Sequence, residues 1–183
     1  CFEAHWNISP VLLRSPGSAH GVTNAYQMPD ELGVDRWLGL LGARTMSRLP
    51  VCVVDCGSAV TIDVMDAGGV HQGGIIIPGY EMMLSSLKRG TAIPAFQKSG
   101  KSFELLGKCT SDCIQSGCAN TIAAIIERVM QSGSRLQRLF MTGGNAAMIS
   151  PLLEHPSIVV PDLIFRGIVQ YISAGSRSGD ASN

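Results

Sequence analysis

An acidic residue followed at once by a turn of small residues is the first feature of the sequence that could carry chemistry. Residues 53–58 read Val-Val-Asp-Cys-Gly-Ser, so an apolar stretch of strand length ends in Asp55, Gly57 and Ser58. Glycine lets a ligand approach the backbone closely, and successive amide N–H groups in such a turn can bind an anion. Because Asp55 would repel a bare phosphate, the combination suits a phosphate that has a cation beside it. The alternative is an ordinary turn in which Asp55 accepts hydrogen bonds from its own backbone.

A pair of glycines forms a second candidate. Gly143 and Gly144 follow the apolar run 138–142 and precede Asn145. At a junction between a strand and a helix, a flat glycine backbone can lie beside a base or sugar, and the helix amides can face a phosphate. The alternative is that the glycines serve only tight packing, which is common at such junctions.

A carboxylate and a guanidinium stand next to each other at Asp35 and Arg36, after a polar run that includes Tyr26 and Gly33. A carboxylate can act as a base and a guanidinium can bind an anion, so the pair suits a substrate that carries a hydroxyl and a negative charge. The alternative is that Asp35 caps a helix and Arg36 is solvated.

Hydrophobic periodicity and turn residues predict the elements that must hold these groups. Three meandering strands followed by alternating helices and strands indicate a mixed α/β domain. Asp30 or Asp35 is the expected cap of the first helix. The expected strands are 10–15, 50–55, 59–66, 70–79, 138–142 and 157–160, the expected helices are 35–46, 80–89, 111–131, 145–154 and 163–174, and residues 175–183 are expected to be a disordered tail.

Composition excludes several classes of function. The chain has 183 residues, 45% of them hydrophobic, and its 14 basic and 14 acidic residues cancel. No charge run suggests nucleic acid or an anionic membrane, and no apolar stretch has the length of a membrane span. The first residues lack the pattern of a secretory signal, and the six cysteines lie in helix-like or strand-like segments, so we expect reduced thiols in the cytoplasm. The spacings Cys52-x3-Cys56 and Cys109-x3-Cys113 differ from the usual zinc knuckle and argue against zinc.

Taken in order, five motifs resemble type III pantothenate kinases, including the members called Bvg accessory factors. They are Gly-Val-Thr-Asn-Ala-Tyr (21–26), Leu-Gly-Val-Asp-Arg-Trp-Leu (32–38), Val-Val-Asp-Cys-Gly-Ser-Ala-Val-Thr-Ile-Asp (53–63), Gly-Val-His-Gln-Gly-Gly-Ile-Ile-Ile-Pro-Gly (69–79) and Thr-Gly-Gly-Asn-Ala (142–146). The resemblance extends to about residue 172. It implies an α/β fold of the actin-like ATPase (ribonuclease H-like, ASKHA) type, a mixed sheet with flanking helices. Residues 1–49 would be the remainder of an N-terminal lobe, residues 50–174 the C-terminal lobe, and 175–183 the tail.

The resemblance also implies a reaction and its participants. The reaction is ATP-dependent phosphorylation of pantothenate, the first step toward coenzyme A, in the bacterial cytoplasm. It implies Mg²⁺, a monovalent cation (K⁺ or NH₄⁺), and a homodimer whose substrate pocket lies at the subunit interface. The residues that match the family's functional positions are Asp35 as the proton acceptor; Tyr26, Gly33, Val34, Arg36 and Thr110 as pantothenate contacts; Gly57, Ser58, Gly143 and Gly144 as ATP contacts; and Asp55 as the ligand of the monovalent cation.

Two departures from the family pattern limit this interpretation. Ser58 stands where the family has Thr, which keeps the hydroxyl. Nothing before residue 20 matches the family's first phosphate-binding motif, Asp-x-Gly-Asn-Ser/Thr, so the strands that carry it are expected to be missing. Two alternatives therefore remain: a non-catalytic relative that acts as a dimeric binding or regulatory protein, and a relative that phosphorylates another small alcohol. The kinase interpretation requires that Asp35 and the turn near Gly57 converge on one cleft.

Overall fold

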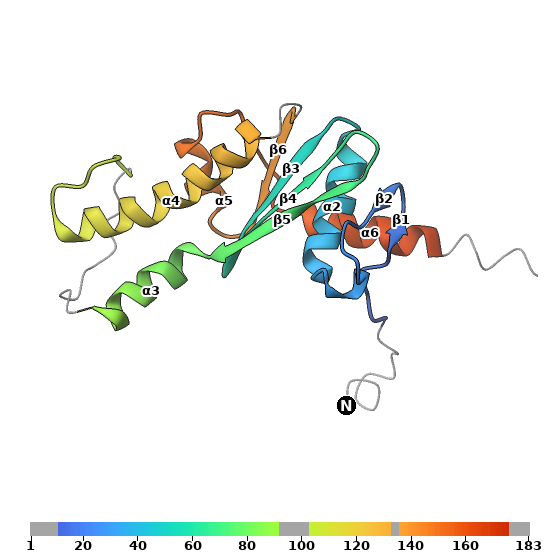
Figure 1. Ribbon diagram of the computed structural model, residues 1–183, viewed down its shortest axis with the longest axis horizontal. Helices are drawn as coiled ribbons and strands as arrows, with labels where there is room; N and C mark the ends of the chain where they lie inside the picture. Colours follow the sequence, from blue (N-terminus) through green and yellow to red (C-terminus); the bar gives the residue numbers. More distant parts are fainter. Residues whose placement is uncertain (1–10, 92–102, 133–135, 176–183) are drawn as a thin grey trace, which may run out of the picture.

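A five-stranded sheet forms the centre of the molecule, with helices on both faces (Figure 1). The computed structural model describes residues 11–91, 103–132 and 136–175. The strand order is β5-β4-β3-β6-β7. The strands are β3 (Val51–Cys56), β4 (Ala59–Met65), β5 (His71–Pro78), β6 (Arg138–Thr142) and β7 (Ile158–Val159), and a separate small ribbon pairs β1 (Ser18–Ala19) with β2 (Val22–Thr23).

The first three strands of the sheet form the predicted antiparallel meander, and the next two join it in parallel. β3 pairs antiparallel with β4 across the turn at Gly57 and Ser58, and β4 pairs antiparallel with β5. β3 also pairs in parallel with β6, which requires the long crossover helix α4 (Thr110–Ser132). Hence the ends of β3 and β6 lie next to each other at one edge of the sheet, where the two candidate glycine turns begin.

Each face of the sheet has its own hydrophobic cluster. Because side chains alternate along a strand, neighbouring residues of β3 contribute to opposite faces. On one face Cys52, Val54, Val60, Ile62 and Met141 pack against Ile114, Cys118, Ile122 and Ile126 of α4. On the other face Val51, Val53, Met65 and Phe140 pack against α2 (Val34–Met46) and α6 (Leu163–Gly175), with Trp37, Leu38, Leu40, Leu41 and Leu163 in the cluster.

α2 and α6 lie against each other over this second face (Figure 1). Their close approach depends on small residues, since an added Cβ at Gly42 would lie 2.2 Å from the carbonyl oxygen of Leu163. The same holds for Gly167, where an added Cβ would lie 2.0 Å from the carbonyl oxygen of Leu38. The helix that carries Asp35 and Arg36 is therefore fixed between the sheet and α6.

Most of the expected elements are present, and three expectations are wrong. The strand expected at 10–15 is absent from its described part, residues 11–15, where Val11 and Leu12 are 76% and 78% exposed and no described strand pairs with them. Neither Asp30 nor Asp35 caps α2: its N-cap is Gly33, and Asp30 lies in a 3-10 helix, Pro29–Glu31. The helix expected at 145–154 breaks into α5 (Ala146–Ile149) and a 3-10 turn (Ser150–Leu152), because a proline follows Ser150.

The remaining helices begin within one residue of the expectation. α3 covers Tyr80–Gly90, α4 begins at Thr110, and α6 begins at Leu163. Of the expected tail, residues 176–183 lie outside the described residues. Among the described residues, no helix combines the length and apolar character that a membrane crossing requires.

Candidate functional site

A small cavity lies between the sheet and the two helices that cover its second face. Its free volume is about 10 Å³, close to the space of one water-sized sphere. Three elements contribute carboxylates to it: α2, β3 and β4. The lining residues are Asp35, Arg36, Gly39, Val53, Asp55, Thr61, Asp63, Thr142 and Ile164.

Strand register explains why these polar side chains meet. Asp55 lies opposite Thr61 in β4 and opposite Thr142 in β6, and Val53 lies opposite Asp63. Directly opposed residues point to the same face of a sheet, so β3, β4 and β6 all present polar groups to α2 at this point. Asp35 and Asp55, separated by twenty positions in the chain, therefore line one cavity.

Asp55 is a half-buried carboxylate that no cationic side chain among the described residues neutralises. Within the described residues, no hydrogen bond or ion pair joins its side chain to a donor, including its own turn backbone. Burial raises the pKa of Asp55 above its ordinary value, and the negative charge of Asp35 raises it further. The Asx-type turn that the sequence left open is thus not formed, and the cavity has room beside Asp55 for a small cation or a water.

Arg36 carries the positive charge nearest to these carboxylates, but Asp63 holds it. Arg36 Nε donates to Asp63 Oδ2 at 2.9 Å and Nη2 donates to Oδ1 at 2.6 Å, a bidentate pair. Arg36 Nη1 donates to the hydroxyl of Tyr26 at 2.9 Å. Arg36 is only 7% exposed and Asp63 only 2%, so this is a buried ion pair.

His71 completes the support of Asp63 from the neighbouring strand. His71 Nε2 lies 2.8 Å from Asp63 Oδ1, and because a carboxylate only accepts, Nε2 is the donor. The ring of Tyr26 stacks on that of His71, with ring centroids 6.1 Å apart. Burial alone would raise the pKa of Asp63, but the hydrogen bonds from His71 and Arg36 and their charges hold it below its ordinary value.

The two glycine turns meet at the edge of the sheet next to the cavity. The amide of Asn145 donates to the carbonyl oxygen of Cys56 at 3.0 Å, which joins the junction after β6 to the end of β3. Gly143 has φ +87°, and an added Cβ there would lie 2.3 Å from Asp55 Oδ1. By contrast, nothing lies within 4 Å of an added Cβ at Gly144. Tight packing therefore accounts for Gly143 but not for Gly144, which faces open space.

The family of this chain follows from its sequence comparisons. The family model described as type III pantothenate kinase matches residues 1–132. The chain belongs to the type III pantothenate kinase family. It is 37% identical over 184 aligned residues to the type III pantothenate kinase of Nitrosococcus oceani, which covers 96% of this chain and 69% of that protein. It is 36% identical to that of Thiobacillus denitrificans, over 92% of this chain and 70% of the relative.

Solved structures agree on the fold. A protein described as a Baf-family transcriptional activator from Campylobacter jejuni is 27% identical and superposes with a TM-score of 0.65, over 84% of this chain and 68% of that one. The activator of 2-hydroxyisocaproyl-CoA dehydratase from Clostridium difficile, with bound ADPNP, is 11% identical and gives a TM-score of 0.52 over 86% of this chain and 73% of that one. The chain therefore has the actin-like ATPase fold that its resemblance to the type III pantothenate kinases implied.

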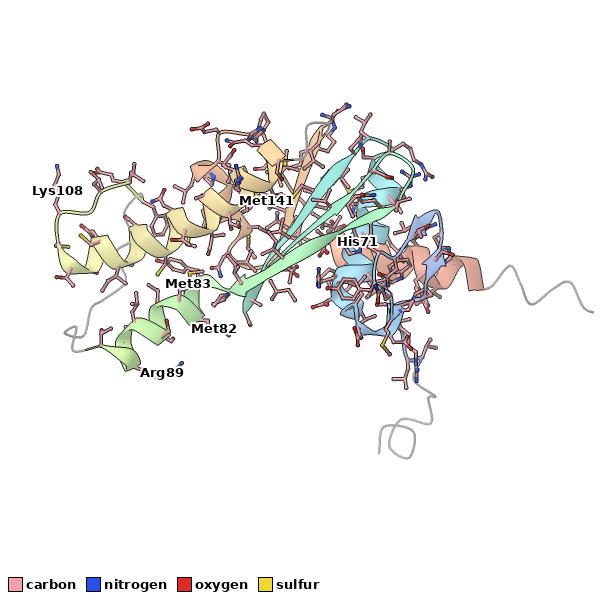
Figure 2. The ribbon with its side chains drawn as sticks, viewed as in Figure 1. His71, Met82, Met83, Arg89, Lys108 and Met141 are labelled. Carbon is pink, nitrogen blue, oxygen red and sulfur yellow. The ribbon has the colours of Figure 1, made fainter. Side chains whose placement is uncertain are left out.

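The residues that match the family's pantothenate contacts do not all gather at the cavity. Arg36 lines it, and Tyr26 reaches it through Arg36. Gly33 and Val34 line an adjoining groove of about 300 Å³, together with Leu13, Arg14, Ser15, Asp30 and Leu32. Thr110 is remote: it begins α4 close to Lys108, and Figure 2 shows Lys108 at the far left end of the molecule, well away from His71, which lies to the right of its centre.

Three polar residues of this site were not singled out from the sequence: Asp63, His71 and Thr142. Asp63 gave the clearest signal, because it is a charged residue inside the apolar run of β4. The adjacent glycines Gly73 and Gly74 were a second signal, since they lie across from Asp63 and its neighbour Val64. Burial raises the pKa of the Cys52 and Cys56 thiols to about 12, and no cluster of three metal-binding side chains occurs among the described residues.

Proposed function

We propose that the protein phosphorylates the primary hydroxyl of pantothenate with ATP, the first step toward coenzyme A. Membership of the type III pantothenate kinase family supports this reaction. The observation that links this reaction to the site is that Asp35 and Asp55 line the same cavity, next to the two glycine turns. A phosphoryl transfer needs its acceptor, its phosphates and its cations in one place.

Asp35 is the proposed acceptor of the hydroxyl proton. It is an exposed residue in the first turn of α2, and its Oδ1 accepts a hydrogen bond from the amide of Arg36 at 2.8 Å. That bond fixes the carboxylate and leaves its second oxygen for a substrate hydroxyl. Because phosphoryl transfer has a loose transition state, the main effect of Asp35 is to orient the hydroxyl and to receive its proton late.

The turn at Gly57 and Ser58 is the proposed contact for the ATP phosphates, and Gly143 and Gly144 are proposed to contact the nucleoside. Ser58 is exposed at the tip of the hairpin, where its hydroxyl and the neighbouring amides can donate to phosphate oxygens. The open space at Gly144 supports the nucleoside contact, because a flat base or sugar can lie where any side chain would project.

Charge balance supports a cation at Asp55. The cavity holds three carboxylates and one guanidinium, and Asp63 already pairs with that guanidinium. Asp35 and Asp55 are left without a positive partner among the described residues, and hard oxygen ligands suit a small cation. We assign the monovalent cation, K⁺ or NH₄⁺, to Asp55 and Mg²⁺ to the ATP phosphates. When bound, these cations would offset the repulsion between the carboxylates and the transferring phosphoryl group.

The remote position of Thr110 supports a homodimer. If Thr110 and Asp35 contact the same pantothenate molecule, they must come from different copies of the chain, because one chain holds them far apart. An apolar groove of about 500 Å³ between α3 and α4 is consistent with a contact there; it is lined by Met83, Ser86, Leu87, Cys113, Ile114, Gly117, Cys118 and Thr121. The absence of charge runs fits a protein of the cytoplasm that acts on small molecules.

The deciding experiment measures ADP release from ATP in the presence of pantothenate. The full product of the gene that encodes this chain is assayed with Mg²⁺ and K⁺, and a panel of other small alcohols serves as the comparison. We expect ADP release that depends on pantothenate and is lost in Asp35→Asn. A protein that binds ATP and pantothenate without turnover would instead favour a dimeric binding or regulatory protein, and turnover of another alcohol alone would change the substrate.

A further inference from the structure

Asp63 lies in the wall of the cavity, where it is only 2% exposed, and its carboxylate bonds to Arg36 and His71. Both of its oxygens are engaged, Oδ2 by Arg36 Nε and Oδ1 by Arg36 Nη2 and His71 Nε2. These three donors arrive from α2 and β5, and Asp63 itself belongs to β4. The local fold is therefore arranged around this carboxylate.

The backbone of β5 is adapted to the Arg36–Asp63 pair. Gly74 lies directly opposite Asp63, and an added Cβ there would lie 2.4 Å from both Arg36 Nη2 and Asp63 Oδ1. Just before it, Gly73 has φ +107° at the point where the register between β4 and β5 shifts. This irregularity brings His71 to Asp63 across the ladder, so two glycines and a bulge maintain one ion pair.

Without Asp63, the charge of Arg36 would act on the other carboxylates of the cavity. Asp35 and Asp55 line the same cavity as Arg36, and neither has a cationic partner among the described residues. An unpaired guanidinium in a partly desolvated site is drawn strongly to any carboxylate within its reach. Arg36 would then occupy the position that we assign to the cation.

We propose that Asp63, supported by His71, is a positioning residue that holds the Arg36 guanidinium at Tyr26 and away from Asp35 and Asp55. This keeps one carboxylate free for the substrate hydroxyl and the other free for the cation. The role of this restraint in catalysis rests on the proposed function. The restraint of Arg36 itself can be measured by binding experiments, without turnover.

The test is Asp63→Asn, which keeps the shape of the side chain and removes its charge. Cation binding is followed as the rise in melting temperature during titration with KCl, with choline chloride holding the ionic strength constant. Pantothenate affinity is measured by calorimetry. We expect the midpoints for K⁺ and for pantothenate each to rise by about 10- to 100-fold, the equivalent of one charge-assisted hydrogen bond.

Arg36→Gln supplies the sharper readout. If Asp63 acts by restraining Arg36, then Asp63→Asn has nothing left to release once Arg36 is replaced. The double variant Asp63→Asn/Arg36→Gln should therefore have a K⁺ midpoint within about twofold of that of Arg36→Gln alone, because the effects of coupled residues are not additive. A merely structural Asp63 would lower the melting temperature alike in KCl and in choline chloride, with an unchanged K⁺ midpoint. That result, or additive effects in the double variant, would overturn the proposal.

The matched control is Asp162→Asn, which removes the carboxylate of an exposed aspartate–arginine pair. Arg166 Nε lies 3.1 Å from Asp162 Oδ1, and the two side chains are 48% and 55% exposed. This variant is expected to leave both midpoints unchanged. Should Asp63→Asn not fold, His71→Phe decides the question, because it removes one hydrogen bond to Asp63 Oδ1 and leaves the β4–β5 backbone in place; an unchanged K⁺ midpoint in that variant would overturn the proposal. A wild-type protein that binds K⁺ but releases no ADP would count against the proposed function and not against the restraint of Arg36.

Discussion

Replacing Gly143 by alanine tests whether the turn after β6 and the carboxylate of Asp55 are packed as closely as the structure requires. The residue has φ +87°, a backbone conformation that L side chains rarely adopt. The new Cβ would also lie 2.3 Å from Asp55 Oδ1 and 2.6 Å from the carbonyl carbon of Cys56. Since Cys56 belongs to the central strand of the sheet, the carboxylate and the turn must move instead.

Two costs add to give the expected magnitude. Alanine at positive φ costs about 1–2 kcal/mol, and forcing an extra carbon into a packed site costs about 1–3 kcal/mol. The expected loss in the free energy of unfolding is therefore about 2–5 kcal/mol. For a chain of this size, each kcal/mol lowers the melting temperature by about 2–4 °C, so a decrease of roughly 4–20 °C is expected.

Gly144→Ala is the matched control, one residue along the chain. An added Cβ at Gly144 meets nothing within 4 Å, and its φ lies outside the strained range. Its melting temperature should stay within about 2 °C of the wild type. If the open space at Gly144 receives the nucleoside, the same variant should weaken ATP binding by about tenfold, measured by calorimetry.

Thermal unfolding of the two variants in parallel decides the matter. Equal melting temperatures for Gly143→Ala and Gly144→Ala would refute the close contact between Gly143 and Asp55. A stable Gly144→Ala variant with unchanged ATP affinity would refute the nucleoside contact, while leaving the packing argument at Gly143 intact.

Three further variants test separate parts of the molecule. Asp35→Asn should lower turnover by about 10²- to 10⁴-fold while the affinity for pantothenate changes little. If the pantothenate affinity, measured by calorimetry, fell by the same factor as turnover, the proposed role of Asp35 would be contradicted. Asp55→Asn should raise the melting temperature at neutral pH, because it removes an unpaired half-buried negative charge next to Asp35. The same variant should abolish activation by K⁺. A lower melting temperature would show that another group balances the charge of Asp55. Glu127→Gln should cost about 1 kcal/mol near neutral pH, since Glu127 accepts bonds from the backbone amides of Glu154 and His155 and from the His155 ring. Burial would raise the pKa of Glu127, but these bonds lower it below its ordinary value of 4.5. The stabilisation by Glu127 is therefore present above pH 4.5 and is lost as the pH falls further. A stability difference between wild type and Glu127→Gln that grows in acid would contradict this.

Local patterns predicted the sheet and most helices well, since they depend on neighbours in the sequence. The apolar runs of β3 and β4, joined by Gly57 and Ser58, predict a hairpin, and the structure has one. The strand expected at 10–15 was wrong because a strand needs a partner, and no described strand lies beside exposed Val11 and Leu12. The break at Pro151 was overlooked because the apolar spacing continued through it.

By itself, the sequence determined which chemical groups the protein brings to its site and in which order they follow along the chain. Residue types alone give the adjacent Asp35 and Arg36, the small turn after Asp55 and the two glycines after Thr142. These features suffice for the family, because a family is defined by motifs and their order. The kinase interpretation required that Asp35 and the turn near Gly57 converge on one cleft, and the structure brings Asp35 into one cavity with Asp55, which precedes that turn.

Only the tertiary structure decided what Arg36 does. Its partner Asp63 lies 27 positions away, and the pairing depends on the register of β4 with β5 and on the packing of α2 over the sheet. The distance from Thr110 to the cavity and the contrast between Gly143 and Gly144 were likewise invisible in the sequence. The physical reason is common to all of them: contacts between distant segments follow from how elements pack, and local propensity contains no information on which face or neighbour a side chain will meet.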